Sequence, residues 1–444
     1  MANYQKPRGT EDLYGEEARK WQVIENEARE LCALYNYEEL ETPIFEHTEV
    51  FKRENDSSDM VNKEMYTFED NGGRSLTLKP EGTAGVIRSY VENKLYASSD
   101  LPKKYFYIGP CFRYERPQKG RLRIFHQFGT EVIGVKNPLV DAEVIALGYS
   151  LLRNLGLEGI KVLINSLGDE ESRTNYREAL KKHFALHIDS MCADCKRRYA
   201  QNPLRILDCK VDADHIAMKD VPNMQDYLTP SSREYFAKVL EALDHLGIPY
   251  EISPKLVRGL DYYTDTVFEV VSVSDRDRAQ STIFAGGRYD KMVGYFGGPE
   301  QSGMGFGVGL ERVVNALEDE GIDLLEPKSL DIYFMPLKED YQQRALEMAT
   351  IARYYGFTSE VDYQARSMKA QFKAADRANA KVYAILGEDE VNDNQITLKR
   401  VKTKEQVTVH ALEMVNKLEE WLSEEVKEEE KEEAEYEESG ISFN

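Results

Sequence analysis

The chain has 444 residues, 41% of them hydrophobic and 31% charged, and its formal net charge is −22 at pH 7. Because single hydrophobic cores stop growing at about 250 to 300 residues, two or three domains are expected. No apolar run approaches the roughly 18 residues of a membrane span, and the polar start "MANYQKPRGTEDLYGEE" lacks the apolar segment of a signal peptide. We therefore expect a soluble protein, and the acidic balance excludes a nonspecific nucleic-acid binder with a basic surface overall.

Five scattered cysteines are too few for a disulfide framework and are typical of the reducing cytoplasm. Cys192, Cys195 and Cys209, with His215, have a spacing that can bind zinc through three thiolates and an imidazole. The alternative is three thiols that bind nothing. Because nothing else in the sequence requires a metal, no metal site is assigned.

In chain order, the first part of the chain combines helices with β segments. A helix is predicted from about Gly15 to Tyr35, β segments run to about Val135, and a second helix covers Asp141 to Leu155. The stretch "KVLINSLG" is typical of a strand and turn. Helical periodicity with charged faces then dominates residues 170–245, which indicates a helical insertion.

The β patterns return in "YEISPKLVRGLDYYTDTVFEVVSV" and "STIFAGGRYD", and "SGMGFGVGLERVVNALEDEG" is typical of a strand that runs into a helix. From about Ser329 strands and helices alternate, which predicts an α/β domain over residues 329–423 after a first domain of residues 1–325. Ten Glu and two Lys between Glu424 and Glu438 predict that residues 424–444 form a solvated, disordered acidic tail.

The segment "FRYERPQKGRLRIFHQF", residues 112–128, holds five Arg or Lys side chains and one acid. Its second part predicts a strand that pairs antiparallel with "YFYIGPCFRYE" through a loop at "RPQKG". The alternation of a strand makes the side from Leu122 to Val132 a core face. The opposite, polar face carries Arg121, Arg123, Phe125, Gln127, Gly129 and Glu131, with Arg113 beside it.

This polar face offers groups for one extended ligand. Guanidinium groups suit phosphate oxygens, an aromatic ring stacks on a flat base, and a carboxylate with an amide can hold an ammonium or an imidazole. The strand therefore indicates a ligand with phosphates at one end and a cation or heterocycle at the other. A solvent-facing hairpin, whose arginines pair with surface carboxylates, is the alternative.

Three other segments offer related groups. In "SGMGFGVGLERV" the glycines alternate from Gly303 to Gly309, which leaves one strand face bare for a flat group beneath Arg312, or else marks a tightly packed strand. Two Tyr-rich segments, "VRGLDYYTDTVFEV" and "AGGRYDKMV", supply hydroxyls that can meet an imidazole nitrogen or simply pack in a core. "LTLKPEGTAG" places Glu81 and Thr83 at a turn, where an ammonium group can be received.

Together these segments resemble one family, the histidyl-tRNA synthetases of the class II aminoacyl-tRNA synthetases, in a bacterial-type form. "LETPIFEHTEVFKR" is similar to motif 1 of the dimer interface, "FRYERPQKGRLRIFHQFGTEVIG" to motif 2 and "GMGFGVGLERVV" to motif 3. "LVRGLDYYTDTVFE" and "AGGRYDKMV" resemble the two signatures peculiar to the histidine enzyme. The likeness runs from about Lys6 to Trp421.

The resemblance implies an α+β catalytic domain on an antiparallel sheet, with a helical insertion and a C-terminal α/β anticodon-binding domain. It implies a cytoplasmic homodimer that makes histidyl-adenylate and pyrophosphate from L-histidine and ATP with Mg²⁺, and then transfers histidine to the 3′ end of tRNA(His). Because such phosphoryl transfer depends on alignment and charge, arginines rather than a general base are expected to carry it.

The resemblance also implies a role for each site residue. The histidine ammonium is received by Glu81, Thr83 and Gln127, and the imidazole faces Glu131, Tyr262, Tyr263 and Tyr289. Arg113 and Arg258 are the catalytic pair at the α-phosphate and belong to both the histidine and the ATP site. The β and γ phosphates meet Arg121, Arg123 and Arg312, with adenine between Phe125 and Arg312. Partners matched to both ring nitrogens can reject an analogue lacking the polar atom by about 10⁴ to 10⁵, so no editing domain is expected.

Basic residues at helical spacing in "RSMKAQFKAADRANAKV", and more in "LKRVKTKE", predict a phosphate patch for tRNA that includes Arg366, Lys369, Lys373 and Arg400. An ordinary solvated helix face is the alternative. By resemblance, Arg116 and Gln118 contact the acceptor end of the tRNA. Asn379 stands where the family has a helix-ending Gly, and Asn tolerates the left-handed conformation.

Two other functions use the same fold. The first is a regulatory paralogue, either a non-catalytic subunit of ATP phosphoribosyltransferase or a sensor of uncharged tRNA. The former usually lacks the C-terminal domain and loses parts of the ATP and signature residues, and this chain retains both. A different class II synthetase or a pure tRNA-binding module would lack the paired histidine signatures. We therefore expect the histidine-specific ATP-dependent ligase.

Overall fold

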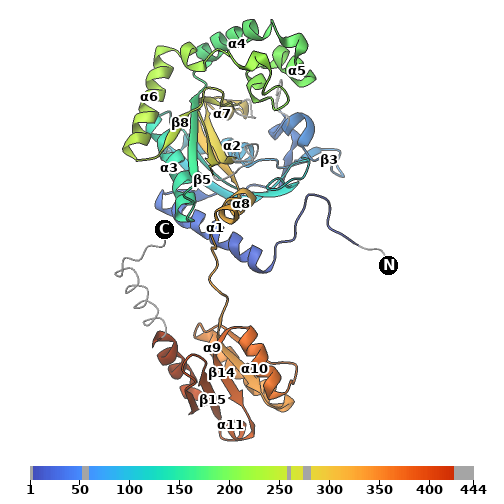
Figure 1. Ribbon diagram of the computed structural model, residues 1–444, viewed down its shortest axis with the longest axis vertical. Coiled ribbons are helices and arrows are strands. Elements are labelled where there is room, and N and C mark those ends of the chain that lie inside the picture. Colours follow the sequence, from blue (N-terminus) through green and yellow to red (C-terminus); the bar gives the residue numbers. More distant parts are fainter. Residues whose placement is uncertain (1–3, 53–59, 258–261, 274–281, 425–444) are drawn as a thin grey trace. The chain divides into compact units, whose positions relative to one another are not determined.

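The computed structural model describes residues 4–52, 60–257, 262–273 and 282–424 (Figure 1). The chain divides into two compact units, Met1–Leu325 and Glu326–Asn444. Arg258 and residues 425–444 of the predicted acidic tail lie outside the described residues. Among the helices that are described, none combines the length and the apolar character needed to cross a membrane.

The first unit is built on a sheet in which eight strands are described, in the order β1-β5-β6-β11-β10-β9-β7-β8. Neighbouring strands are antiparallel except the outer pairs β1 with β5 and β7 with β8, so the expected antiparallel sheet is confirmed. The strands are β1 (Glu38–Glu39), β5 (Lys103–Phe112), β6 (Ile124–Ile133), β7 (Ile160–Ser166), β8 (Tyr250–Ile252), β9 (Thr264–Ser272), β10 (Thr282–Tyr289) and β11 (Gly303–Gly309).

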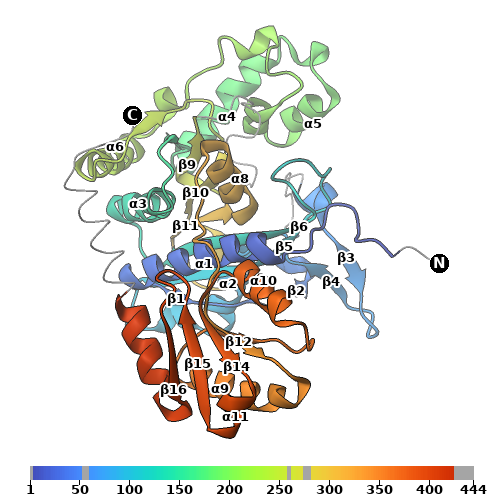
Figure 2. The ribbon, with the colours of Figure 1, turned by 60° about the horizontal axis from the view of Figure 1, so that its bottom comes forward.

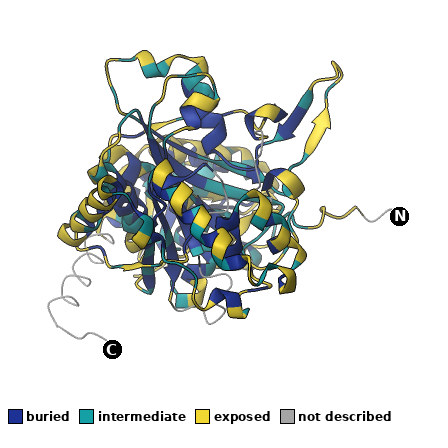
Figure 3. Ribbon diagram, turned by 90° about the horizontal axis from the view of Figure 1, so that it is seen from above, coloured by how far each residue is buried: buried dark blue, intermediate teal, exposed yellow. Residues whose placement is uncertain are grey.

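Helices cover one face of this sheet and form the larger core with it. They are α1 (Gly15–Leu34), α3 (Pro138–Asn154), α6 (Pro230–His245) and α8 (Leu310–Glu320), and α1 is seen crossing the sheet in Figure 2. Ile24, Leu147 and Val313 from three helices pack with Phe128 and Phe306 from the strands, all at most 2% exposed. Figure 3 shows the same division, with dark, buried strands inside and exposed outer helix faces. The predicted core face of β6 is therefore confirmed at Phe128, and Val132 is buried in the same cluster.

A second core lies on the other face of the sheet and contains the side chains that matter for the site. It includes Tyr107, Val267 and Tyr289 from the strands and apolar residues of four helices. These helices are α2 (Thr83–Glu92), α4 (Glu170–Phe184), α5 (Ala193–Gln201) and α7 (Met292–Tyr295). The last helix of the predicted insertion differs from α4 and α5: Phe236, Val239 and Leu243 of α6 belong to the first core, because α6 packs on α3.

A small sheet of β2 (Phe45–His47), β4 (Ser75–Leu78) and β3 (Thr67–Glu69) stands beside the large one and leads the chain into α2. The second unit has a five-stranded sheet in the order β13-β12-β14-β15-β16 among the described residues. Its strands are β12 (Leu330–Pro336), β13 (Ser359–Val361), β14 (Ala380–Leu386), β15 (Gln395–Arg400) and β16 (Gln406–His410), and its helices are α9 (Gln342–Tyr354), α10 (Met368–Arg377), α11 (Glu388–Asn392) and residues 414–424.

The predicted alternation of strands and helices in the second unit is confirmed. Helix α9 and residues 414–424 pack with Phe334 and Leu398 in one cluster, and Ala375 of α10 packs with Tyr333 and Met335 in another. Asn379 ends α10 with φ of 51°, which confirms that Asn supplies the left-handed position there.

A fully buried ion pair ties β10 to α3. Arg288 and Asp141 both have 0% side-chain exposure, and Arg288 Nε donates to the Asp141 carboxylate at 3.0 Å. Arg288 also donates to the carbonyl of Val135 at 3.1 Å and to the Ser302 hydroxyl. Since Arg288 and Tyr289 are neighbours on one strand, they face opposite sides of the sheet. The ion pair therefore fixes the strand position from which Tyr289 reaches the site.

Removing one partner of this pair leaves a buried charge without compensation. We expect Asp141→Ala to lower the free energy of unfolding by about 3 to 5 kcal/mol. The exposed pair of Lys238 and Glu234, 56% and 70% exposed, is the control; Lys238→Ala should leave the free energy of unfolding nearly unchanged. Denaturant unfolding of both variants measures this, and equal losses would contradict the structural role of Arg288.

Candidate active site

A cleft of about 610 Å³ opens on the second face of the large sheet. Nine of the residues that line it were singled out in the sequence, and they come from separate segments of the chain: Glu81, Thr83, Arg113, Arg121, Phe125, Gln127, Tyr262, Tyr263 and Arg312. The segments meet because β6 and β11 are adjacent at the centre of the sheet, while α2 begins above them. Folding thus brings together residues up to about 230 positions apart in the chain.

The floor of the cleft rests on the Glu131 carboxylate, which is 1% exposed. Its Oε1 accepts a hydrogen bond from the Thr83 hydroxyl at 2.6 Å, and its Oε2 accepts one from the Tyr289 hydroxyl at 2.5 Å. Burial raises the pKa of Glu131 to about 8, against the opposing effect of these hydroxyl donors. The carboxyl group lies directly beneath Thr83, which lines the cleft.

Glu81 and Gln127 complete the polar floor. Glu81 Oε1 accepts from the Ala84 backbone N–H at 3.0 Å at the start of α2, and its Oε2 accepts from the Tyr262 hydroxyl at 3.4 Å. Gln127 Oε1 accepts from the Gly82 backbone N–H at 3.0 Å. The beginning of α2 therefore positions both acceptors, and the floor combines acidic groups with hydroxyl donors.

The glycines of β11 are needed because side chains pack against them. A methyl group at Gly303 would meet the Tyr289 ring at 2.1 Å, one at Gly305 would meet Glu131 Oε2 at 2.1 Å, and one at Gly307 would meet Gln127 Nε2 at 2.4 Å. Side chains of the neighbouring strands cover the bare face from Gly303 to Gly307, as the alternative of a tightly packed strand expected. Only Gly307 and Gly309 line the cleft.

Tyr107 is a site residue that the sequence analysis missed. It lies opposite Gly129 in the β5–β6 register, and methyl groups at Gly82 and Gly129 would meet its ring at 2.1 and 2.3 Å. Burial raises the pKa of the Tyr107 hydroxyl far above its ordinary value, and the charge of Glu131 adds to this. The sequence could have indicated this residue, because a Tyr opposite a Gly on a paired strand can lie across it. Recognising the pair requires the register of β5 and β6, which the sequence analysis did not have.

The mouth of the cleft is basic. Arg113 Nε donates to the carbonyl of Pro80 at 2.9 Å, and Arg121 pairs with Glu115 at 3.2 Å. Arg312 donates to the carbonyl of Thr282, and burial together with the charge of Arg121 lowers the pKa of Arg312. Glu115, the one acid of the basic segment, partly neutralises these groups, as the alternative of paired surface arginines expected.

The structure places the side chains of two residues of the basic hairpin, Leu122 and Arg123, differently from the predicted strand. Regular pairing begins only at Ile124, so Leu122 lines the cleft instead of facing the core. Arg123 turns away to stack on Tyr114 at 4.1 Å and lines a second hollow with Arg8 and Arg116. Its predicted contact with the ATP phosphates stays a prediction that the described cleft does not support.

Phe125 lines the cleft, as expected of a ring that stacks on a base. The guanidinium carbon of Arg113 lies 5.2 Å from the ring centroid, so one face of the ring is already covered by a cation. Only the other face is left for a flat group. Gln118 is bridged to Arg121 across the hairpin loop, which holds the loop beside the mouth.

The walls of the cleft also contain residues that were not predicted. Glu269 and Glu311 supply carboxylates, and Glu311 accepts from the His126 backbone N–H at 2.9 Å. Arg198 and Lys210 come from the helical region between β7 and β8. The cleft is therefore bounded by the sheet on one side and by the α5 region on the other.

The predicted tRNA patch of the second unit is only partly at the surface. Lys369 and Lys373 are exposed on α10. Arg366 is bound to the buried Asp362, with its Nε 2.7 Å from Oδ2. Arg400 is 3% exposed and donates to Glu424 at 2.9 Å, so its side chain is buried, and its role in the tRNA patch stays a prediction.

A sheet of this topology, with a polar floor and a basic mouth, is the catalytic domain of a class II aminoacyl-tRNA synthetase. Residues 9–313 match the family model described as histidyl-tRNA synthetase, and residues 331–421 match one described as an anticodon binding domain. The chain belongs to the histidyl-tRNA synthetase family.

Similar proteins agree with this assignment. The chain is 51% identical to a histidine–tRNA ligase of Bacillus licheniformis, covering 91% of this chain and 95% of that protein, and 52% identical to one of Anoxybacillus flavithermus, covering 92% and 96%. The crystal structure of the apo histidyl-tRNA synthetase of S. aureus superposes with a TM-score of 0.80 at 39% identity, covering 94% of this chain and all of that one.

Gly305 tests the packing of the floor. A methyl group there would lie 2.1 Å from Glu131 Oε2 and 2.3 Å from the Thr130 carbonyl, neither of which can move without disturbing the sheet. We expect Gly305→Ala to lower the melting temperature and to reduce substrate turnover by at least about 100-fold, since small displacements of site groups have such effects. Gly294→Ala, where nothing lies within 4 Å, is the control and should change neither.

The raised pKa of Glu131 predicts a pH-dependent stability. The folded protein holds a proton on Glu131 up to about pH 8, whereas an unfolded Glu loses it near its ordinary value of 4.5. The free energy of unfolding therefore falls through this group as pH rises from about 4.5 to 8, and the loss is complete above that range. Glu131→Gln does not titrate and should escape this loss.

The measurement is the melting temperature of wild type and Glu131→Gln at pH 5 and pH 8. The difference, variant minus wild type, should become more positive at pH 8, by about 2 to 4 °C for each kcal/mol involved. A difference that is the same at both pH values would show that Glu131 is ionised throughout.

Proposed function

We propose that this chain is a histidine–tRNA ligase, which forms histidyl-adenylate and pyrophosphate from L-histidine and ATP and then transfers histidine to the 3′ end of tRNA(His). The observation that carries the proposal is the division of charge in one cleft. Glu81 lines the floor, with Glu131 buried beneath Thr83, whereas Arg113, Arg121 and Arg312 lie at the mouth. This arrangement fits a cationic heterocycle below and a polyphosphate above.

The floor would receive histidine. Glu81, Thr83 and Gln127 are placed to accept the ammonium group, since all three line the cleft within one cluster of hydrogen bonds. Glu131 would accept from an imidazole nitrogen, because a carboxylate with two hydroxyl donors still has lone pairs free. The remaining ring nitrogen would meet a Tyr hydroxyl, from the group of Tyr262, Tyr263 and Tyr289.

The mouth would align ATP. Arg113 would stand at the α-phosphate, with Arg258 as its expected partner outside the described residues, and Arg121 and Arg312 at the β and γ phosphates. Adenine would lie on the free face of Phe125, opposite the guanidinium of Arg113. A histidine carboxylate oxygen attacks the α-phosphorus, the bond to the bridging oxygen breaks, and pyrophosphate leaves with the electron pair. The arginines stabilise the charge that builds on the phosphoryl oxygens.

In the second step a 3′-terminal ribose hydroxyl attacks the carbonyl carbon of the adenylate. The bond from carbonyl carbon to phosphate oxygen breaks, AMP leaves, and the hydroxyl proton passes to a phosphate oxygen. Cys111, which is buried beside Gln127, is unsuited to act as a nucleophile because burial raises its pKa to about 12. The side chains of the protein thus position the substrates and stabilise the charge that builds in the reaction, and none of them has to form a covalent intermediate.

Mg²⁺ would enter with ATP. The carboxylates of Glu115, Glu269 and Glu311 line the cleft and are oxygen ligands of the type that Mg²⁺ takes beside phosphates. When bound, the ion would neutralise charge on the β and γ phosphates.

The chain would act as a cytoplasmic homodimer. In the segment similar to motif 1, Ile44 and Phe45 are 47% and 52% exposed, and Phe68 on the neighbouring part of the small sheet is 43% exposed. The rings of Phe45 and Phe68 lie 6.3 Å apart. An apolar group of this kind, contributed by the two outer strands of the small sheet, is what a second copy would cover.

Amino-acid-dependent exchange of labelled pyrophosphate into ATP tests the proposed function. Each of the twenty amino acids is supplied in turn, and only histidine should support exchange. Folded protein that binds tRNA but exchanges pyrophosphate with no amino acid would overturn the enzyme and favour a regulatory paralogue.

The same assay separates two arginines of the hairpin. Arg121 lines the cleft and Arg123 does not, although they are two residues apart. We expect Arg121→Ala to lower kcat/KM for ATP by about 10- to 100-fold, the cost of a lost charge-assisted phosphate contact. Arg123→Ala should change it by less than about threefold. The reverse order would mean that the hairpin rearranges when ATP binds.

The tRNA contact is tested on the second unit. Replacing the exposed Lys369 and Lys373 by Ala should weaken tRNA charging and reduce the slope of log affinity against log salt by about 1.4 to 1.8. Pyrophosphate exchange should not change. Lys338→Ala, at another exposed lysine of this unit, is the control; an equal effect of the control would show that no specific patch exists.

A further inference from the structure

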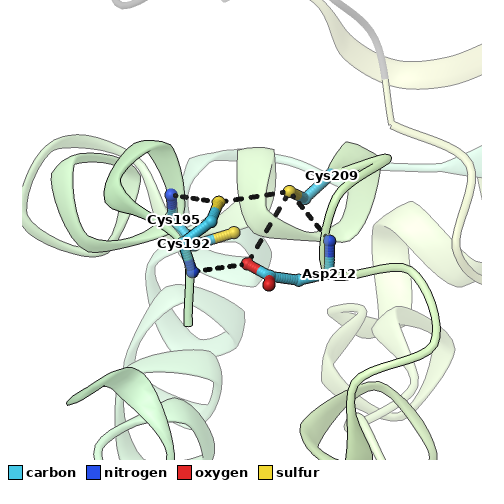
Figure 4. Close-up of side chains that lie close together, drawn as sticks. All are labelled: Cys192, Cys195, Cys209 and Asp212. Atoms are coloured by element: carbon cyan, nitrogen blue, oxygen red, sulfur yellow. Dashed lines mark hydrogen bonds between the residues drawn. The ribbon is translucent and has the colours of Figure 1, made fainter. Parts of the chain in front are cut away.

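Three thiols and a carboxylate converge at the wall of the cleft, which Cys209 itself lines. They belong to Cys192 at the start of α5, Cys195 in its first turn, and Cys209 and Asp212 after the 3-10 turn Pro203–Asp208 (Figure 4). One potential ligand atom of each lies within 4.8 Å of those of all the others. No part of the proposed ligase reaction uses them.

The spacings fit a shared metal ion. A tetrahedral zinc with Zn–S of about 2.3 Å and Zn–O of about 2.0 Å holds two sulfurs roughly 3.8 Å apart, and a sulfur and an oxygen roughly 3.5 Å apart. The Sγ atoms of Cys192 and Cys209 are 3.7 Å apart, and Cys209 Sγ is 3.8 Å from Asp212 Oδ2.

The backbone orients the sulfur in the same way in two pairs of residues, Cys192 with Cys195 and Cys209 with Asp212. Cys192 Sγ accepts from the backbone N–H of Cys195 at 3.4 Å, and Cys209 Sγ accepts from the backbone N–H of Asp212 at 3.5 Å. Each pair is thus a turn in which a sulfur faces the N–H three residues later.

The carboxylate of Asp212 is buried without a salt bridge to a Lys or Arg among the described residues. Asp212 is 8% exposed, and its carboxylate accepts from the Cys192 backbone N–H at 2.9 Å and from the thiols of the cluster, Cys209 among them at 3.8 Å. No Lys or Arg in the described part of the chain forms a salt bridge with it within 4.0 Å. Buried carboxylates are ordinarily paired or bound to metals.

His215 is not a member of this cluster, contrary to the spacing argument. Its Nδ1 accepts from the Ala217 backbone N–H at 3.1 Å, and its Nε2 lies 3.1 Å from the Ser190 hydroxyl. Both ring nitrogens are therefore engaged away from the thiols.

We propose that Cys192, Cys195, Cys209 and Asp212 bind one structural zinc ion. All four positions come from the protein, so the site is closed and has no position for a substrate. Lys210 and Val211, the two residues between Cys209 and Asp212, line the cleft together with Arg198 of α5. The zinc would hold this wall of the cleft against α5.

Metal analysis of the full chain tests the proposal directly. Protein purified without chelator and dialysed against metal-free buffer should contain one zinc per chain. After removal of zinc under reducing conditions, Co²⁺ should bind and give visible absorption of a tetrahedral ion with a thiolate-to-cobalt band. Wild type alone decides the main point, so a variant that fails to fold leaves the test intact.

Variants identify the ligands. Cys195→Ser and Asp212→Asn should lose zinc or shift the cobalt spectrum, whereas His215→Ala should keep both. Cys32→Ser, at a buried thiol of α1, is the matched control and should also keep them.

Three results would overturn the proposal. One is a wild-type chain that binds neither Zn²⁺ nor Co²⁺ while all five thiols react after denaturation. Another is a mass lower by two hydrogens with Cys192 and Cys209 joined in a disulfide. The third is a cobalt spectrum lost in His215→Ala but kept in Asp212→Asn.

Discussion

The site depends on the space that β11 leaves open at the centre of the sheet. Glu131 and Gln127 on β6 and Tyr289 on β10 all lean over glycines of this strand, at distances where a methyl group would clash. A buried carboxyl group can then accept hydroxyl hydrogen bonds from two directions, Thr83 at the start of α2 and Tyr289 on β10. A side chain at Gly305 would displace Glu131, the group that we propose binds the imidazole.

Charge is separated along the cleft by the fold rather than by composition. The acidic floor is held by α2 and the central strands, whereas the basic mouth comes from the hairpin loop and the first turn of α8. A buried pair outside the cleft, Arg288 with Asp141, fixes β10 so that Tyr289 has one position. An acidic protein therefore presents concentrated positive charge at one place, where ATP would bind.

The sequence predicted the elements and the polar groups at the floor and mouth of the cleft, because the period-2 alternation of a strand and the paired signatures both reflect local structure. It failed where the answer depends on neighbours. The regular pairing of β5 with β6 stops at Ile124, so Leu122 does not face the core and Arg123 lines the second hollow instead of the cleft. Tyr107 was missed because its role depends on the register that places it opposite Gly129. Arg400 was predicted at the surface from charge alone, although Glu424 covers it. The spacing of the sequence likewise indicated His215 as the fourth metal ligand, whereas the turn after Cys209 brings Asp212 to the thiols.

The central claim is that Glu131 recognises the histidine side chain. Its most direct test is the KM for histidine, and separately for ATP, in pyrophosphate exchange by wild type and Glu131→Gln. The account predicts that KM for histidine rises by about 10- to 100-fold, as expected if Glu131 gives up its proton and accepts a charged hydrogen bond when histidine binds, while KM for ATP stays within about threefold. An unchanged KM for histidine in a folded variant would contradict it and place the imidazole elsewhere in the cleft.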